Sequence, residues 1–133
     1  MAGKAKAVAN GGELEESVRA LCEQLGLETR SQVKVGRRIW GAERKIDVVV
    51  TDKQSGKRIG VECKFQGGGG SAEEKIPTTI QDIKAWPIPG IVVFSGDGIS
   101  PHMKSFLIST GLAIEKADLE SWLRLFFGLD LEG

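Results

Sequence analysis

Two stretches decide the fold: KIDVVVT at residues 45–51 and KRIGVECKF at residues 57–65. Both are rich in β-branched residues, and in the second the apolar residues stand at alternate positions, so each predicts a β-strand. A turn-forming DKQSG segment joins them. Each strand also carries charge within its apolar run: Asp47 in the first, and Glu62 and Lys64 in the second.

The segments on either side complete an α/β pattern. Upstream, an amphipathic helix precedes a half-exposed strand, so that three consecutive strands on short loops form an antiparallel meander. Downstream, helices alternate with short apolar strands, as in a sheet covered by helices. We therefore expect an α-β-β-β-α-β core with a mixed sheet flanked by helices. The elements outside the two quoted strands are expected at residues 13–25 (helix), 32–40 (strand), 71–85 (helix), 91–94 (strand), 101–109 (helix), from 114 (strand) and 117–127 (helix).

The composition describes one compact domain. A chain of 133 residues is long enough for one hydrophobic core and too short for two ordinary domains. We expect a flexible arm at residues 1–12 and a single domain at residues 13–133. The 18 basic and 18 acidic residues balance, which excludes a protein that holds nucleic acid by net charge alone. Residues 1–66 nevertheless carry 13 basic and 9 acidic side chains, an excess that fits either an anionic partner or a solvated face.

Other features indicate a protein of the cell interior. Cys22 and Cys63 are too few for a disulfide-stapled secreted domain and are not spaced for zinc, so we expect buried free thiols in a reducing compartment. No apolar run approaches the roughly 18 residues that span a bilayer. The start of the chain lacks the continuous apolar segment of a signal peptide. We expect a cytoplasmic protein with no membrane association, bound to the nucleoid when it holds DNA.

The charged residues in the two strands predict a metal site. Side chains alternate between the faces of a strand, so Glu62 and Lys64 point the same way. If the two strands pair, Asp47 can lie next to Glu62, and two carboxylates at one point repel each other unless a cation lies between them. Hard oxygen ligands suit Mg²⁺, and a neighbouring lysine can orient or activate a water. The alternative is a ladder of exposed ion pairs on the sheet face.

The order of these residues resembles the PD-(D/E)xK nuclease superfamily, whose members are restriction-endonuclease-like. The matching features are a helix, then ID on one strand, then VECK on the next, over roughly residues 12 to 95. The segment LEESV in the first helix resembles the FE-x-x-V opening of such proteins, and Gln66 resembles the ExKxQ variant. Ile46 stands where the proline of the family name would be, which leaves the acid that follows in place.

The resemblance implies a restriction-endonuclease-like fold and a Mg²⁺-dependent phosphodiesterase, with Mn²⁺ as a substitute. Such an enzyme cuts DNA, or occasionally RNA, and leaves a 5′-phosphate. It assigns Asp47 and Glu62 as metal ligands, Glu15 as an outer ligand, Lys64 as the residue that orients or activates the water, and Gln66 as a supporting polar contact. The geometry of the first helix favours Glu15 over the adjacent glutamate, because Glu15 lies at the margin of the apolar stripe.

A basic cluster flanks the strand that carries Asp47. Such groups contact backbone phosphates, and their place beside the expected site is what phosphodiester cleavage requires. The glycine-rich segment that follows Gln66 leads into a helix N-terminus, which can bind phosphate. A solvated strand face and a flexible connector are the alternatives. The expected DNA contacts are Arg37, Arg38, Arg44, Lys45, Ser71 and Lys75.

These features together predict a Mg²⁺-dependent DNA endonuclease. One alternative is a structure-specific nuclease of the Holliday-junction-resolvase type, which would prefer four-way junctions. Another is a non-catalytic DNA-binding domain that has kept the fold. The last helix carries more apolar residues than one stripe needs, so it either completes the core or forms a homodimer contact. Those residues are Leu119, Trp122, Leu123, Phe126 and Phe127.

Overall fold

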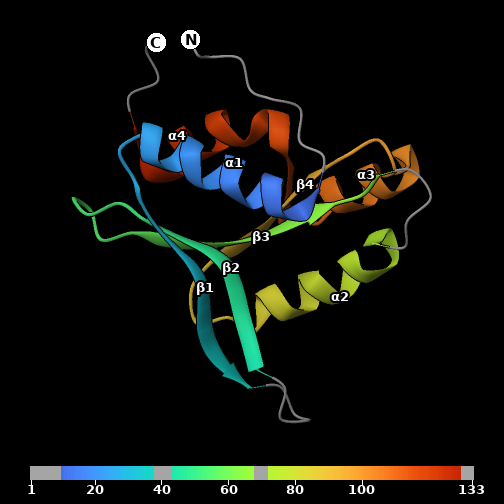
Figure 1. Ribbon diagram of the computed structural model, residues 1–133, viewed down its shortest axis with the longest axis horizontal. Coiled ribbons are helices and arrows are strands. Elements are labelled where there is room, and N and C mark those ends of the chain that lie inside the picture. The colour runs from blue at the N-terminus through green and yellow to red at the C-terminus, as the bar shows by residue number, and fades with distance from the viewer. Residues whose placement is uncertain (1–9, 38–42, 68–71, 130–133) are drawn as a thin grey trace.

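The computed structural model describes residues 10–37, 43–67 and 72–129 of the chain (Figure 1), with the side chains of residues 37, 43 and 72–76 outside that description. Within these residues, no helix has the length and apolar character that a bilayer-crossing segment needs. The elements are α1 (Gly11–Gln24), β1 (Glu28–Arg37), β2 (Glu43–Thr51), β3 (Arg58–Phe65), α2 (Ala72–Lys84), β4 (Gly90–Ser95), α3 (Pro101–Ser109), β5 (Ala113–Glu115), a 3₁₀ turn (Lys116–Asp118) and α4 (Leu119–Phe127).

The five strands form one mixed sheet in the order β1-β2-β3-β4-β5. The first three pair antiparallel, and β3, β4 and β5 pair parallel. This confirms the expected meander and the α-β-β-β-α-β core. Several boundaries differ from expectation, among them the starts of α1 and β1. The α1 helix begins at Gly11, since Asn10 caps it by accepting from the Glu13 N–H at 2.8 Å, so residues 11 and 12 belong to the helix and not to the arm. The β1 strand begins at Glu28 instead of Gln32.

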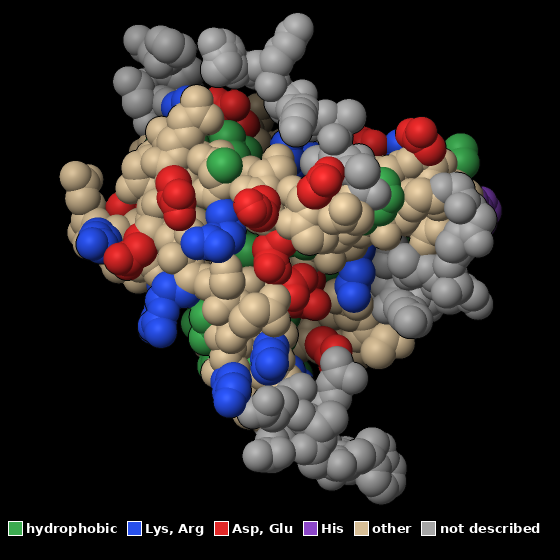
Figure 2. Space-filling view, viewed as in Figure 1, with side chains coloured by type: hydrophobic (Ala, Val, Ile, Leu, Met, Phe, Trp, Pro, Cys, Tyr) green, Lys and Arg blue, Asp and Glu red, His purple; other side chains and the backbone are tan. Residues whose placement is uncertain are grey.

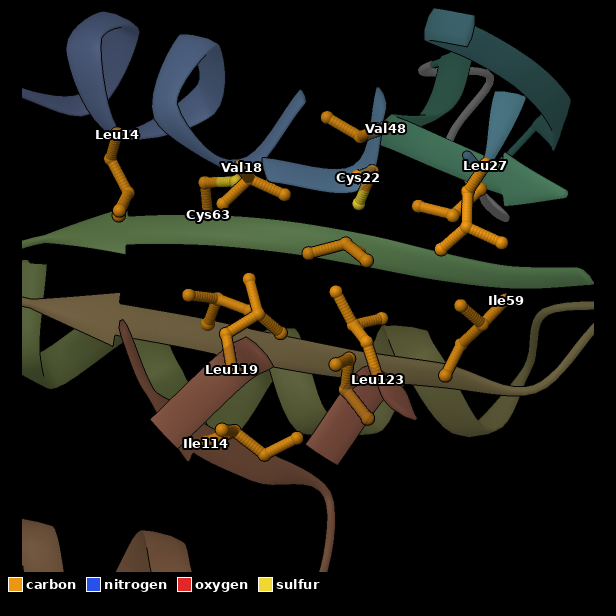
Figure 3. Close-up of a cluster of buried hydrophobic side chains, with 14 of the residues drawn as sticks. Leu14, Val18, Cys22, Leu27, Val48, Ile59, Cys63, Ile114, Leu119 and Leu123 are labelled. Atoms are coloured by element: carbon orange, nitrogen blue, oxygen red, sulfur yellow. The ribbon is translucent and has the colours of Figure 1, made fainter. Parts of the chain in front are cut away.

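Helices cover both faces of the sheet, and each face has its own hydrophobic cluster. On one face, α1 and α4 pack over β2, β3 and β4 (Figure 1). Figure 3 shows Leu14, Val18 and Cys22 of α1 directed at the sheet, in a cluster that also holds Leu119 and Leu123 of α4. Cys22 and Cys63 are both buried here as free thiols, as expected. The apolar stripe of α1 therefore fixes which side of that helix faces the strands.

On the opposite face, α2, α3 and the segment after α2 build the second cluster, around Trp86 and Phe94. The indole of Trp86 lies against the strand backbone, where glycine leaves room for it. A Cβ atom added at Gly60 would lie 2.7 Å from a ring carbon of Trp86, and one added at Gly90 would be closer still. These two glycines on neighbouring strands allow the tryptophan to pack directly on the sheet.

The last helix completes the core. Three of the five residues considered for a dimer contact are buried: Leu119, Leu123 and Phe127. Trp122 and Phe126 are half-buried, and their rings stack with centroids 5.0 Å apart. The exposed apolar residue of α4 is Leu125, with 69% of its surface accessible. The apolar surface left for a partner is therefore smaller than the sequence indicated.

Candidate active site

The site forms where β2 parts from β3. Pairing between these strands runs from Thr51 to Val48 and stops there, with Val48 opposite Val61. Ile46 and Val49 both pack in the cluster on the α2 side, although they are three positions apart in the strand. Strict alternation would place them on opposite faces, so β2 twists at Asp47. Figure 1 shows the free ends of β1 and β2 bending away from the rest of the sheet.

Side chains take over the backbone bonds at this fork. The Asp47 Oδ2 atom accepts a hydrogen bond from the backbone N–H of Cys63 at 2.9 Å. In return, the Glu62 Oε1 atom accepts from the backbone N–H of Asp47 at 3.0 Å. Each carboxylate is therefore fixed by the strand that carries the other, and bonds of this charge-assisted kind are strong. This interlock confirms the expectation that Asp47 and Glu62 lie next to each other.

Glu15 reaches the same place from α1. Its link to Asp47 is Gln32 of β1, whose Nε2 atom donates to Glu15 Oε2 at 3.1 Å and to Asp47 Oδ1 at 3.3 Å. Nothing in the local sequence marks Gln32 as a site residue, because a glutamine that alternates with basic residues is typical of an exposed strand. Its backbone is unusual: among the described residues, Gln32 is the one non-glycine residue with a positive φ, at 52°.

The three carboxylates make a concentrated negative site. Burial, and after it the charge of Asp47, raise the pKa of Glu62 from its ordinary value of 4.5 to about 7. The thiol of Cys63 responds to the same charges, since burial and then Asp47, Glu15 and Glu62 raise its pKa. A carboxyl group that resists ionisation in this way is one that a cation would stabilise.

Lys64 lies on the strand of Glu62 and two residues beyond it, so both side chains leave the same face of β3. Its positive charge lowers the pKa of Glu62, in opposition to burial. Asp82 of α2 acts on Glu62 in the other direction and raises that pKa. The α2 helix therefore brings a fourth acidic side chain toward the site, which no local motif around residue 82 had indicated.

Gln66 lies at the end of β3 and is 3% exposed. Its side-chain amide donates to the Gly67 carbonyl at 2.8 Å, and its backbone bonds to Ser95 and Gly98 in the loop after β4. The approach is close, because a Cβ atom at Gly98 would overlap the Gly67 carbonyl oxygen. These contacts hold the end of the strand that carries Glu62 and Lys64.

The carboxylate oxygens at this site are the type of ligand that a hard divalent cation prefers. Mg²⁺ in proteins usually takes one or two carboxylates and keeps several waters, so the interlocked Asp47 and Glu62 suffice as protein ligands. Within the described ranges, no group of three His, Cys, Asp or Glu side chains is already arranged to hold a metal ion. The amide of Gln32 stands between Glu15 and Asp47, so Glu15 meets Asp47 through Gln32.

Basic side chains lie on the β1–β2 hairpin next to the site. Lys34 and Lys45 are both exposed and face each other in the register of the two strands. Arg44 is half-buried, and its Nε atom is buried with no hydrogen-bond partner among the described residues. Figure 2 shows acidic side chains gathered in the middle of this face, with Lys and Arg side chains around them. The remaining expected contacts lie outside the described residues (Arg38, Ser71) or have side chains outside them (Arg37, Lys75).

Comparison with known proteins agrees with this architecture. The family model for a PD-(D/E)XK nuclease superfamily domain matches residues 6–124. Among solved structures, protein VC1899 from Vibrio cholerae superposes with a TM-score of 0.53 at 18% identity, over 84% of this chain and 31% of that one. The chain thus spans about a third of that protein, and the likeness shows the fold. No curated protein matches the chain. The family match runs from the first helix into the last and includes the strands that meet at the Asp47–Glu62 fork, and the chain belongs to the PD-(D/E)XK nuclease superfamily.

Proposed function

We propose that this chain is a Mg²⁺-dependent endonuclease that hydrolyses phosphodiester bonds in DNA, with Mn²⁺ able to replace Mg²⁺. The observation that carries the proposal is the interlock of Asp47 and Glu62 at the fork between β2 and β3, with Lys64 on the face of Glu62. Family membership makes nuclease chemistry the expected use of such a site. The cation, the substrate and the residue roles are parts of this proposal.

Asp47 and Glu62 would hold the cation, with Glu15 as an outer ligand. A bound Mg²⁺ supplies positive charge that polarises the phosphoryl oxygen and favours deprotonation of an attacking water. Lys64 orients that water and stabilises the negative charge that develops on the phosphate. Gln66 is a positioning residue, because its contacts fix the end of β3.

The β1–β2 hairpin would hold the DNA backbone. Arg44 and Lys45 lie within three residues of Asp47, so phosphates bound to them are close to the proposed ligands. The Nε atom of Arg44 is buried without a partner among the described residues, so it can donate to a phosphate oxygen only after the side chain turns outward. Arg37, Arg38, Ser71 and Lys75 belong to the same proposal as further contacts.

Supercoiled plasmid tests the proposal directly. Wild-type protein with Mg²⁺ should convert it to nicked and linear DNA, and excess chelator should stop the reaction. Lys64→Ala should lose cleavage by about 10²-fold or more while its DNA affinity changes little, because the lysine acts on the reaction and not on docking. Lys53→Ala, on the exposed turn after β2, is the matched control and should cleave as wild type does. Cleavage that persists in chelator contradicts the metal requirement.

A four-way junction beside a linear duplex of the same sequence separates the two nuclease classes. Preferential cleavage of the junction would favour the resolvase alternative. Binding to DNA without cleavage, by wild-type protein in either Mg²⁺ or Mn²⁺, would favour the non-catalytic domain.

A further inference from the structure

Gln32 occupies the space between two of the proposed ligands. Its Nε2 atom lies 3.1 Å from an oxygen of Glu15 and 3.3 Å from an oxygen of Asp47. Both acceptors are carboxylates, so the group directed at them is the –NH₂ end of the amide, which can donate to both at once. An amide nitrogen of this kind donates hydrogen bonds and is not a ligand for a hard cation.

The backbone of Gln32 has an unusual conformation at this contact. The register of β1 with β2 pairs Ser31 with Val48 and Val33 with Ile46, so Gln32 stands opposite Asp47. That pair is omitted from the ladder, and Gln32 has a φ of 52°. A non-glycine residue in the left-handed region is strained, and such strain persists where the surroundings over-determine it. Here the strained residue lies at the fork, with its side chain directed at the two acids.

We propose that Gln32 is a positioning residue that closes the site: its amide group stands in for positive charge between Glu15 and Asp47 and must turn away when a divalent cation binds. This inference rests on the proposed function, because it presumes that the two carboxylates serve a cation. In the absence of a cation, the two hydrogen bonds reduce the repulsion between the carboxylates and stabilise the fold. In its presence, the same bonds oppose binding.

Two substitutions separate the side chain from the backbone. Gln32→Met keeps the length and removes the donor, whereas Gln32→Gly removes the side chain and accepts a positive φ without strain. Both variants should bind Mn²⁺ more tightly than wild type, by roughly threefold to thirtyfold, since two hydrogen bonds no longer compete. Without metal, Gln32→Met should melt at a lower temperature than wild type, and Gln32→Gly should lose less because its backbone is relaxed. Gln54→Met, on the exposed turn after β2, is the control and should leave Mn²⁺ affinity unchanged.

Affinity can be measured without activity by titrating the full chain with Mn²⁺ and following free Mn²⁺ by its electron paramagnetic resonance signal. Tighter binding in both variants, together with a lower metal-free melting temperature for Gln32→Met, supports the inference; a role in packing alone would change melting and leave affinity unaltered. Wild-type binding that neither variant tightens overturns the inference alone. A wild-type chain that binds no Mn²⁺ at millimolar concentration overturns the proposed metal-dependent function as well.

Discussion

Replacing Glu62 by glutamine should make the metal-free protein more stable at alkaline pH. Glutamine keeps an oxygen that can accept the Asp47 N–H bond and removes the charge that burial opposes. The pKa of Glu62 is 4.5 in its ordinary state and about 7 in the folded protein, so the folded state binds the proton more tightly than the unfolded state. Wild-type stability therefore falls as pH rises through the window from 4.5 to about 7.

The size of the effect follows from the displacement of the pKa. One pKa unit corresponds to about 1.4 kcal/mol, so the cost of ionising Glu62 in the folded state has an upper limit of about 3 kcal/mol at pH 8 and is under about 1 kcal/mol at pH 5. Relaxation and residual solvent contact reduce this, and we expect Glu62→Gln to gain about 2 kcal/mol at pH 8 and much less at pH 5. Urea unfolding in chelator at the two pH values measures the difference directly.

The matched control is Glu16→Gln, at an exposed position of α1, which should change stability by no more than about 0.5 kcal/mol at either pH. In Mg²⁺, wild type should become more stable than Glu62→Gln. A cation that binds the folded state stabilises wild type by mass action, whereas Glu62→Gln lacks one of the proposed ligands and gains less. Two results would contradict this reasoning: Glu62→Gln less stable than wild type at pH 8 in chelator, or a gain in stability at pH 5 equal to that at pH 8. Either would mean that ionising Glu62 does not cost stability in the folded protein.

Three further predictions concern packing, DNA and assembly. Gly60→Ala should destabilise the fold by about 1–3 kcal/mol in urea unfolding, because the added methyl meets the indole ring, whereas Gly11→Ala has open space and should be neutral or slightly stabilising. Arg44→Ala and Lys45→Ala should each weaken DNA binding about equally across sequences and lower the magnitude of the salt slope by about one, as seen in affinity measured against salt concentration. We propose a homodimer through α4, for which light scattering should give twice the chain mass for wild type and the monomer mass for Leu125→Asp; a wild-type monomer that still linearises plasmid excludes it.

Much of the fold could be predicted because its decisive patterns are local. Each of these patterns occupies a short, continuous stretch of sequence, and the structure contains the element that each predicts. They are the apolar runs at 45–51 and 57–65, the turn between them and the apolar stripe of α1. The start of β1 was wrong for a physical reason. Residues 28–31 read Glu-Thr-Arg-Ser and have no apolar alternation, and they become a strand because they pair with residues 48–51 of β2. Tertiary pairing overrides weak propensity at such an edge.

Some residues of the candidate site could likewise be predicted from local sequence, and others could not. Asp47, Glu62 and Lys64 could be found because charge within an apolar strand is visible in the sequence. Gln32 and Asp82 could not, since neither breaks a local pattern. Gln32 matters because the register of β1 places it opposite Asp47, and Asp82 matters because α2 packs across the face that carries Glu62. Both contributions depend on contacts between segments far apart in the chain.

The fork between β2 and β3 connects stability with the proposed chemistry. An ordinary ladder would satisfy the backbone of Asp47 and Cys63 with backbone partners and leave the carboxylates free to point toward water. Here the carboxylates accept those N–H bonds themselves, and one of them, Glu62, is a half-buried acid whose pKa rises to about 7. The arrangement is costly for a metal-free fold and favourable once positive charge arrives. Glu62→Gln is therefore expected to raise metal-free stability and to weaken cation binding, and that opposition is the mark of a site arranged for a ligand and not for the fold.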